Sequence, residues 1–303
     1  MLDRSIEAET SDGGNAGSPG RPPGYPNQLQ QELDVEGYAV VKDVLTPEQV
    51  QFLRGVMKKH LKSGGWFNYG GKFQVQAMHA VPGIAQVLTC DAVLDVLKQV
   101  TQPLEVVLTG ECDLMINTTS TWHKDITHHP VYSDGRVFED GGLPIYKVAF
   151  YLQDQGEASR ATLKVRPRSH RLANGDHMPV SKAAVKAGDA LIFDIRIDHL
   201  GQLPTLTDKM LRKALERVCP KLHVDAQKVF TRSRSVIRWF RRAAQDRMAI
   251  FLTFGPFNEW TLAYAEVSGH RHASIPETLG AEVLARLALC KVILPPAGLG
   301  PLI

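Results

Sequence analysis

Two histidines and one aspartate of this 303-residue chain have the spacing of a metal site that could support redox chemistry. His123 and Asp125 stand two residues apart in TWHKD, so on an extended segment both side chains point to the same face. His199 follows the apolar run GDALIFDIRI, where a turn can direct its side chain inward. Two histidines and one carboxylate on one face of an iron ion leave its other positions open. We therefore predict that these three residues bind one metal ion.

Other pairs in the chain have similar spacings. His223 and Asp225 repeat the His-x-Asp pattern, but they lie in a basic segment with a helical pattern, without strands to support a metal site. His270 and His272 have the His-x-His spacing that cupin metal sites use. Their glycine and arginine neighbours are more typical of a solvated loop. Both pairs are therefore weaker candidates than TWHKD.

The segments around the predicted metal site have the pattern of short strands. From Leu104 onwards, β-branched or alternating runs are separated by Gly, Pro, Asp and Asn. These runs are LEVVLTG, CDLMIN, YKVAFYLQD, ATLKVRP, GDALIFDIRI and MAIFLTFG. Many short strands with turn signals predict a β-sandwich or barrel, in which strands distant in sequence can be neighbours.

The flanking segments predict a tail and several helices. Residues 1–30 are rich in Gly, Pro, Ser and Asn, which predicts a disordered tail ahead of a single domain at 31–303. Thr46-Pro47-Glu48-Gln49 has the pattern of a capping box with proline at the first helical position, so we expect a helix from there to about residue 62. Apolar spacing predicts another helix near 92–100. Ser274-Ile275-Pro276-Glu277 has capping-box spacing again, and predicts a helix at about 274–290.

A basic, mostly helical insert is expected at about 205–246, between two strands. From Lys209 to Arg247 the chain has twelve Lys or Arg and three acids, whereas the net charge of the whole chain is +3. The insert could cover an anionic substrate, contact an anionic lipid or polysaccharide, or present a solvated face. No recognised module for nucleic acid surrounds it, so we expect no nucleic-acid partner.

The composition excludes several classes of protein. A hydrophobic content of 44% and a charged content of 22% are ordinary for a globular protein. No apolar run reaches the roughly 18 residues that a transmembrane helix needs. The first residues lack the apolar core of a secretory signal, and the four cysteines form no CxxC pair, so we expect a cytoplasmic protein with reduced thiols.

In order and spacing these segments resemble the phytanoyl-CoA dioxygenase-like branch of the iron(II)- and 2-oxoglutarate-dependent oxygenases. The resemblance covers roughly residues 34–200 and resumes near 246. It rests on GYAVVKDVLTPEQVQFLR, WHKD, YKVAFYLQD, ATLKVRPRSHR and GDALIFDIRIDHLG. The chain departs from the family pattern at Arg168, where a glycine is usual, and at Ala161-Thr162, where Gly-Pro or Gly-Cys is common.

The resemblance implies a mainly β fold with flanking helices, a double-stranded β-helix (jelly roll, cupin-like), in which His123, Asp125 and His199 bind Fe(II). It also implies 2-oxoglutarate and O2 as cosubstrates, with an arginine on the distal carboxylate of 2-oxoglutarate. A guanidinium suits that task because it makes two parallel charge-assisted hydrogen bonds. The family's arginine lies about a dozen residues after the distal histidine, which would point to Arg212. We choose Arg247 instead, because it opens the strand-like MAIFLTFG once the insert is removed.

Five further residues are candidates for contacts in the site. Asn117 and Lys147 lie near the predicted barrel mouth and could touch 2-oxoglutarate, although both could simply be polar surface residues. Trp122, Lys124 and His128 are candidates for substrate contacts. Trp122 could equally be a core aromatic, Lys124 a solvated side chain on the face opposite the ligands, and His128 a loop residue.

The predicted activity is oxidation of a small molecule, coupled to the conversion of 2-oxoglutarate to succinate. Hydroxylation is the expected outcome, on an anionic or polar biosynthetic substrate. Asp125 argues against halogenation, since related halogenases often have a small residue there so that chloride can bind. Two alternatives stay open: a cupin-like metalloenzyme that uses His270 and His272 without 2-oxoglutarate, and a non-catalytic jelly-roll binding protein. The sequence leaves the substrate and the oligomeric state open.

Overall fold

The computed structural model describes residues 26–68, 70–126, 136–139, 145–240, 246–271 and 279–294. Its strands are β1 (Tyr38–Val41), β2 (Trp66–Asn68), β3 (Gly71–Gln74), β4 (Val106–Ile116), β5 (Tyr146–Tyr151), β6 (Leu163–Val165), β7 (Ser181–Ala183), β8 (Ala190–Asp194), β9 (His199–Leu200), β10 (Met248–Pro256) and β11 (Val292–Ile293). Its α-helices are α1 (Gln28–Glu36), α2 (Pro47–Ser63), α3 (Ala77–Ala80), α4 (Ile84–Leu88), α5 (Asp91–Thr101), α6 (Arg136–Glu139), α7 (Leu206–Val218), α8 (Ala226–Phe240), α9 (Glu259–Arg271) and α10 (Ala281–Leu289). None of the helices in these ranges is long and apolar enough to cross a membrane.

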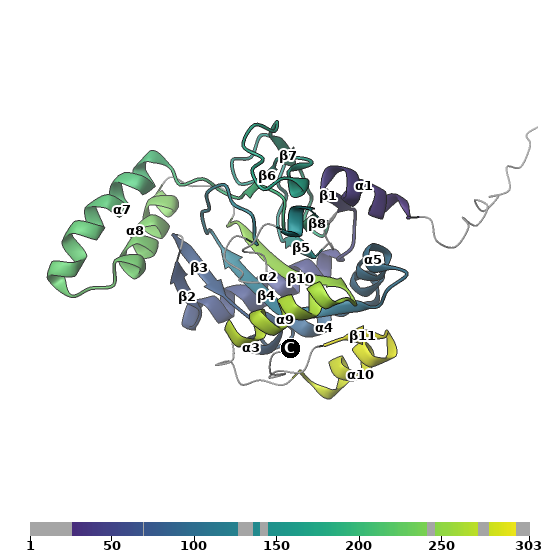
Figure 1. Ribbon diagram of the computed structural model, residues 1–303. Coiled ribbons are helices and arrows are strands. Elements are labelled where there is room, and N and C mark those ends of the chain that lie inside the picture. Colours follow the sequence, from purple (N-terminus) through teal and green to yellow (C-terminus); the bar gives the residue numbers. More distant parts are fainter. Residues whose placement is uncertain are drawn as a thin grey trace, which may run out of the picture.

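The strands form two sheets. The larger has the order β1-β8-β5-β10-β4-β3-β2, with β11 pairing in parallel with β4, and the smaller has the order β7-β6-β9. All other strand pairs are antiparallel. The helices flank these sheets (Figure 1). The predicted fold class is therefore confirmed: a mainly β jelly roll with flanking helices.

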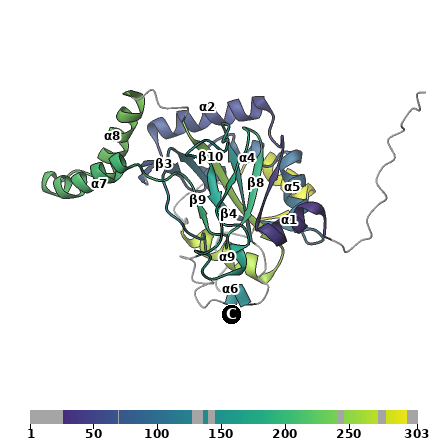
Figure 2. The same cartoon turned by 90° about the horizontal axis from the view of Figure 1, so that it is seen from above.

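The two faces of the larger sheet bury different sets of side chains. Val148 and Phe150 of β5 pack into the main hydrophobic core, which also contains side chains of α2, α4 and α5. In Figure 2 the helix α2 runs along this side of the sheet. Ala149 and Tyr151 point the other way, into a second cluster shared with the smaller sheet. Because side chains alternate along a strand, Lys147 shares that inner face. The space between the sheets can therefore hold polar groups from β5.

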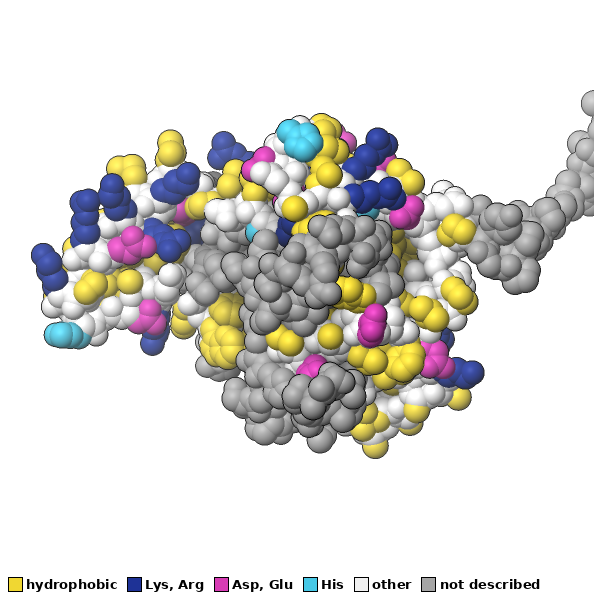
Figure 3. Space-filling view, in the orientation of Figure 1, with side chains coloured by type: hydrophobic (Ala, Val, Ile, Leu, Met, Phe, Trp, Pro, Cys, Tyr) yellow, Lys and Arg dark blue, Asp and Glu magenta, His cyan; other side chains and the backbone are white. Residues whose placement is uncertain are grey.

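The insert is a pair of helices, α7 and α8, that projects away from the sheets (Figures 1 and 2). It lies between β9 and β10, and β10 then returns to the middle of the large sheet, between β5 and β4. Lysines, arginines and apolar side chains lie on its surface (Figure 3). Leu206 and Met210 of α7 are 79% and 74% exposed. The expected helical character of residues 205–240 is thus observed, and residues 241–245 lie outside the described part of the chain.

Local sequence signals placed two helices correctly. The Thr46 side chain accepts a hydrogen bond from the Gln49 backbone N–H, the Thr46 backbone N–H donates one to Gln49 Oε1, and α2 begins at Pro47. The helix expected near 92–100 is α5. The runs LEVVLTG and CDLMIN, in contrast, form a single strand, β4. Gly110 has a φ of +82°, a conformation that glycine adopts without strain, and the strand continues through it.

Two predicted boundaries are wrong. The helix α1 begins at Gln28, inside the expected tail, because Asn27 and Gln30 form a capping box. Residues 1–25 lie outside the described residues. The C-terminal helix begins at Ala281, with Gly280 before it, and not at the predicted capping box. That box, at 274–277, is also outside the described residues.

Candidate metal centre

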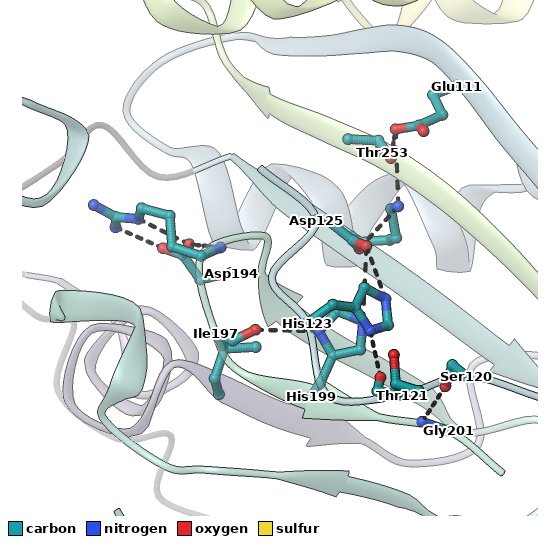
Figure 4. A network of polar contacts seen from close by, with 12 residues as sticks. Glu111, Ser120, Thr121, His123, Asp125, Asp194, Ile197, His199, Gly201 and Thr253 are labelled. Carbon is teal, nitrogen blue, oxygen red and sulfur yellow. Dashed lines mark hydrogen bonds and ion pairs between the residues drawn. The ribbon is translucent and has the colours of Figure 1, made fainter. Parts of the chain in front are cut away.

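His123, Asp125 and His199 come together between the two sheets (Figure 4). The backbones of His123 and His199 exchange two hydrogen bonds, with N···O distances of 3.1 and 3.0 Å. The Asp125 backbone N–H donates to the Ile195 carbonyl at 2.9 Å, so the TWHKD segment is fixed against the segment that ends in β9. One potential ligand atom from each of the three side chains lies within 4.8 Å of the others. Backbone pairing thus brings His199 next to His123, although the two residues are far apart in the sequence.

The two imidazole rings are oriented by backbone carbonyls. His123 Nδ1 lies 2.7 Å from the Thr121 carbonyl oxygen, and His199 Nδ1 lies 3.1 Å from that of Ile197. A proton on each Nδ1 satisfies these contacts and leaves each Nε2 as a lone-pair donor. Both Nε2 atoms face Asp125 Oδ1, at 3.5 and 3.8 Å. These residues therefore fit a divalent ion held by two imidazoles and one carboxylate.

The protonation states of the three side chains suit the same arrangement. Burial lowers the pKa of His199 to about 4, so its ring is neutral at neutral pH. Burial opposes ionisation of Asp125, but Lys147 and the two histidines outweigh it and hold the pKa of Asp125 well below its usual value. Burial lowers the pKa of His123, but Asp125 and the Thr121 carbonyl together outweigh it, and the pKa is raised overall. A metal ion at His123 Nε2 would take the place of that proton.

Lys147 lies between two carboxylates. Its Nζ is 2.9 Å from Asp125 Oδ2 and 3.8 Å from Glu111 Oε2. Burial disfavours the charged amine, but the two carboxylates raise the pKa of Lys147 overall. Glu111 Oε2 also accepts hydrogen bonds from Thr253 Oγ1 at 2.8 Å and from the Tyr264 hydroxyl at 2.7 Å. Glu111 is not among the predicted site residues, although an acid inside the β-rich run TGECDLMIN is a usable signal.

Arg247 is buried directly before β10, with 5% of its surface exposed. Its Nε donates to the Ala161 carbonyl at 3.2 Å and its Nη2 to the Tyr151 hydroxyl at 3.1 Å. A Cβ added to Gly201 would lie 3.3 Å from Arg247 Nη2, so the guanidinium lies against the backbone two residues after His199. Among the residues that the structure describes, no carboxylate forms an ion pair with Arg247. A buried cation in this position can bind an anionic ligand.

Asn117, at the end of β4, contacts the segment that leads into β10. Its Oδ1 accepts from the Arg247 backbone N–H at 3.0 Å, and its Nδ2 donates to Asp246 Oδ1 at 2.8 Å. The Asn117 carbonyl accepts a hydrogen bond from Arg234 of α8. Its side chain is therefore engaged in fixing the backbone of Arg247, and the helical insert is tied to the same point.

Lys124 lies on the opposite side of the TWHKD segment from the metal-site residues. Its side chain is buried, with 4% of the residue exposed, so the expectation of a solvated side chain is wrong. The ammonium donates to the carbonyls of Ser169 at 2.7 Å and Arg196 at 2.6 Å, and lies 3.1 Å from Asp198 Oδ2. Two carbonyls and one carboxylate thus hold the ammonium on this side of the segment, and a substrate contact of Lys124 stays a prediction.

The other predicted substrate residues are Trp122 and His128. Trp122 is half-buried, and the guanidinium of Arg166 lies 4.4 Å from the centre of its ring. The tryptophan is thus part of a cation–π pair beside the metal-site residues. His128 lies outside the described residues.

The competing metal pairs receive no support from the described part of the chain. His223 and Asp225 are exposed at the turn between α7 and α8, and His123, Asp125 and His199 form the one group there that could hold a metal ion. The side chain of His270 and all of His272 lie outside the described residues. Arg212, the alternative to Arg247 for the distal carboxylate, lies on α7, with its side chain 59% exposed.

Comparison with known proteins agrees with this architecture. The family model of phytanoyl-CoA dioxygenase matches residues 33–203, more than half of the chain. The search of curated proteins gave no match. Among solved structures, the non-heme alpha ketoglutarate dependent carbocyclase SnoK from nogalamycin biosynthesis is 15% identical, with 79% of this chain and 87% of SnoK covered and a TM-score of 0.51. HygX from Streptomyces hygroscopicus, with nickel and 2-oxoglutarate bound, is also 15% identical, with 76% and 87% covered and a TM-score of 0.50. These two structures share the fold, and the family match shows that the chain belongs to the phytanoyl-CoA dioxygenase family of oxygenases, whose cofactors are Fe(II), 2-oxoglutarate and O2.

Proposed function

We propose that this protein hydroxylates a small, anionic or polar biosynthetic molecule while it converts 2-oxoglutarate to succinate, with Fe(II) held by His123, Asp125 and His199. One observation carries this proposal. The three side chains place their ligand atoms within 4.8 Å of one another, and both histidines have Nδ1 beside a carbonyl and Nε2 directed at Asp125. Bound Fe(II) would supply the site that activates O2 together with 2-oxoglutarate.

Arg247 is the proposed contact for the distal carboxylate of 2-oxoglutarate. Its guanidinium is buried against Gly201, two residues from the metal-site residue His199, and makes no ion pair with another described residue. The contacts of Asn117 and Lys147 support positioning roles, in place of the direct contacts with 2-oxoglutarate that we expected. Asn117 fixes the backbone of Arg247, and Lys147 binds Asp125.

Asp125 supports the proposed reaction outcome, and the basic insert supports the proposed kind of substrate. A carboxylate at this position favours hydroxylation over halogenation, because it occupies the place that chloride would need. SnoK, a carbocyclase with the same fold, illustrates that the fold by itself does not set the outcome. The positive charge of α7 and α8 supports an anionic substrate. Trp122 is the proposed substrate contact, since it is half-buried beside His123. A role for His128 and a cytoplasmic location stay predictions.

Turnover of 2-oxoglutarate in the presence of Fe(II) and O2 tests this function. His123→Ala should abolish the formation of succinate, while His177→Ala, which changes an exposed histidine, should leave it unchanged. Under the cupin-like alternative His270→Ala would abolish activity and His123→Ala would spare it; a binding protein would form no succinate at all. With isotopically heavy O2, hydroxylation places one labelled oxygen in succinate and one in the product. Succinate formation by His123→Ala at the wild-type rate would contradict the proposal.

A further inference from the structure

The two carboxylate oxygens of Asp125 face different partners. Oδ1 lies 3.5 Å from His123 Nε2 and 3.8 Å from His199 Nε2. Oδ2 lies 2.9 Å from the Lys147 ammonium. A charge-assisted hydrogen bond of this length fixes the rotation of the carboxylate. One oxygen is thus presented to the histidines, and the other is held by Lys147.

Lys147 in turn depends on Glu111 as its second counterion. The Lys147 and Glu111 side chains are only 9% and 12% exposed, so water screens their charges little. Three elements fix the Glu111 carboxylate: Lys147 on β5 at 3.8 Å, Thr253 on β10 at 2.8 Å and Tyr264 on α9 at 2.7 Å. Figure 4 shows Glu111 and Thr253 on the side of Asp125 away from the histidines. Glu111 therefore lies away from the metal-site histidines, and Lys147 is the side chain that contacts both Glu111 and Asp125.

The charges of this cluster decide how strongly it attracts a cation. Asp125 and Glu111 each contribute one negative charge, and Lys147 contributes one positive charge, so the cluster carries a net charge of −1 beside the imidazoles. Without Glu111 the net charge of these three groups would be zero, and Asp125 would be the one described carboxylate still paired with the buried ammonium. Lys147 would then compete with a divalent ion for the same carboxylate.

We propose that Glu111 is a positioning residue of the metal centre: it shares the charge of Lys147, and so keeps Asp125 Oδ1 available to a divalent ion. This inference rests on the proposed function, in which His123, Asp125 and His199 bind the metal. Residues that orient metal ligands from outside the coordination sphere typically change metal affinity 10- to 100-fold when they are mutated. Glu111 has the contacts to act in this way.

Titration of the metal-free protein with Co(II), without 2-oxoglutarate, tests the inference. Glu111→Gln keeps the size of the side chain and removes its charge, and should raise the Kd for Co(II) by about 10- to 100-fold. The matched control is Glu105→Gln, which removes an exposed carboxylate next to the start of β4 and should leave Kd within about twofold. In a Lys147→Met background, Glu111→Gln should raise Kd by a clearly smaller factor than it does alone, because the part of its effect that passes through Lys147 is then absent, and a double-mutant cycle measures that part.

A milder pair of variants keeps the test decisive if Glu111→Gln does not fold. Tyr264→Phe and Thr253→Val each remove one hydrogen bond to Glu111 but keep its charge, and each should raise Kd by a smaller factor than Glu111→Gln. An unchanged Kd in the Glu111 variant, or an equal loss with and without Lys147, would overturn the inference. So would variants that lower the melting temperature of the metal-free protein but keep the wild-type Kd. If wild type and His123→Ala bind Co(II) equally well, the proposed metal site itself fails, and this inference with it.

Discussion

Replacing Arg247 with lysine should weaken the binding of 2-oxoglutarate and leave the rate at saturation much less affected. Lysine keeps the positive charge but loses the planar fork that can bind both oxygens of a carboxylate. Arg247 is 5% exposed and braced by Tyr151 and Ala161, so little water can replace the lost donor. A hydrogen bond to a charged group contributes about 1.5–3 kcal/mol. Because about 1.4 kcal/mol corresponds to a factor of ten, the KM for 2-oxoglutarate should rise about 10- to 100-fold.

The assay is the initial rate of succinate formation against the concentration of 2-oxoglutarate. Arg212→Lys is the matched control, because the family spacing would select Arg212. Its side chain is 59% exposed and paired with Glu216 one helical turn away, so the control should keep its KM within about twofold. A KM for Arg247→Lys within twofold of the wild type would refute the assignment. A large rise in KM with Arg212→Lys would transfer the role to Arg212.

Three further changes test the framework around the site. Asp194→Asn should lower the free energy of unfolding by about 3–5 kcal/mol, because it leaves Arg196 buried without the carboxylate that binds it at 2.6 and 2.9 Å. Urea unfolding measures this free energy, and a loss below about 1 kcal/mol would contradict the prediction. Burial lowers the pKa of His199 from 6.5 to about 4, so the unfolded chain binds a proton at a higher pH than the folded chain does. The unfolding free energy of the metal-free protein should therefore fall by about 3 kcal/mol between pH 6.5 and 4. His199→Gln should remove that part of the pH dependence, and an identical pH profile for the variant would refute the argument. Arg234→Met should speed hydrogen exchange in α7 and α8 and raise the KM for 2-oxoglutarate a few-fold, because the buried Arg234 side chain links α8 to the Asn117 carbonyl. Arg232→Met, which changes an exposed arginine of the same helix, should have neither effect. Equal effects of the two variants would exclude this role of Arg234.

Features set by neighbouring residues could be predicted from the sequence. The capping box at Thr46 needs only four consecutive residues, and α2 begins where they predict. The same signal, Asn27-x-x-Gln30, is present at the start of α1. It lies next to a Gly- and Pro-rich region, and the predicted tail therefore extends over the first residues of this helix. The sequence pattern divides this stretch into the runs LEVVLTG and CDLMIN, because glycine is common in turns, whereas β4 continues through Gly110 with positive φ.

Features that depend on strand order could not be predicted in this way. Glu111 and Lys147 meet because β10 lies between β4 and β5, with Thr253 of β10 bonded to Glu111. Neither the spacing of these residues nor their types indicates such a pairing. The burial of Lys124 likewise depends on carbonyls more than 40 positions away, which single-segment patterns do not encode. The proximity of His123, Asp125 and His199 could be predicted because the motif and its resemblance to a family supplied the missing long-range information, and their role as metal ligands is a proposal.

Anaerobic addition of 2-oxoglutarate to the Fe(II)-loaded protein tests the central claim most directly. Binding of both to one centre gives a visible metal-to-ligand charge-transfer band, and no primary substrate is needed. We predict this band in the wild type and in His177→Ala, and its loss in His123→Ala. Absence of the band in the wild type, or its full retention in His123→Ala, would contradict an iron and 2-oxoglutarate centre at His123, Asp125 and His199.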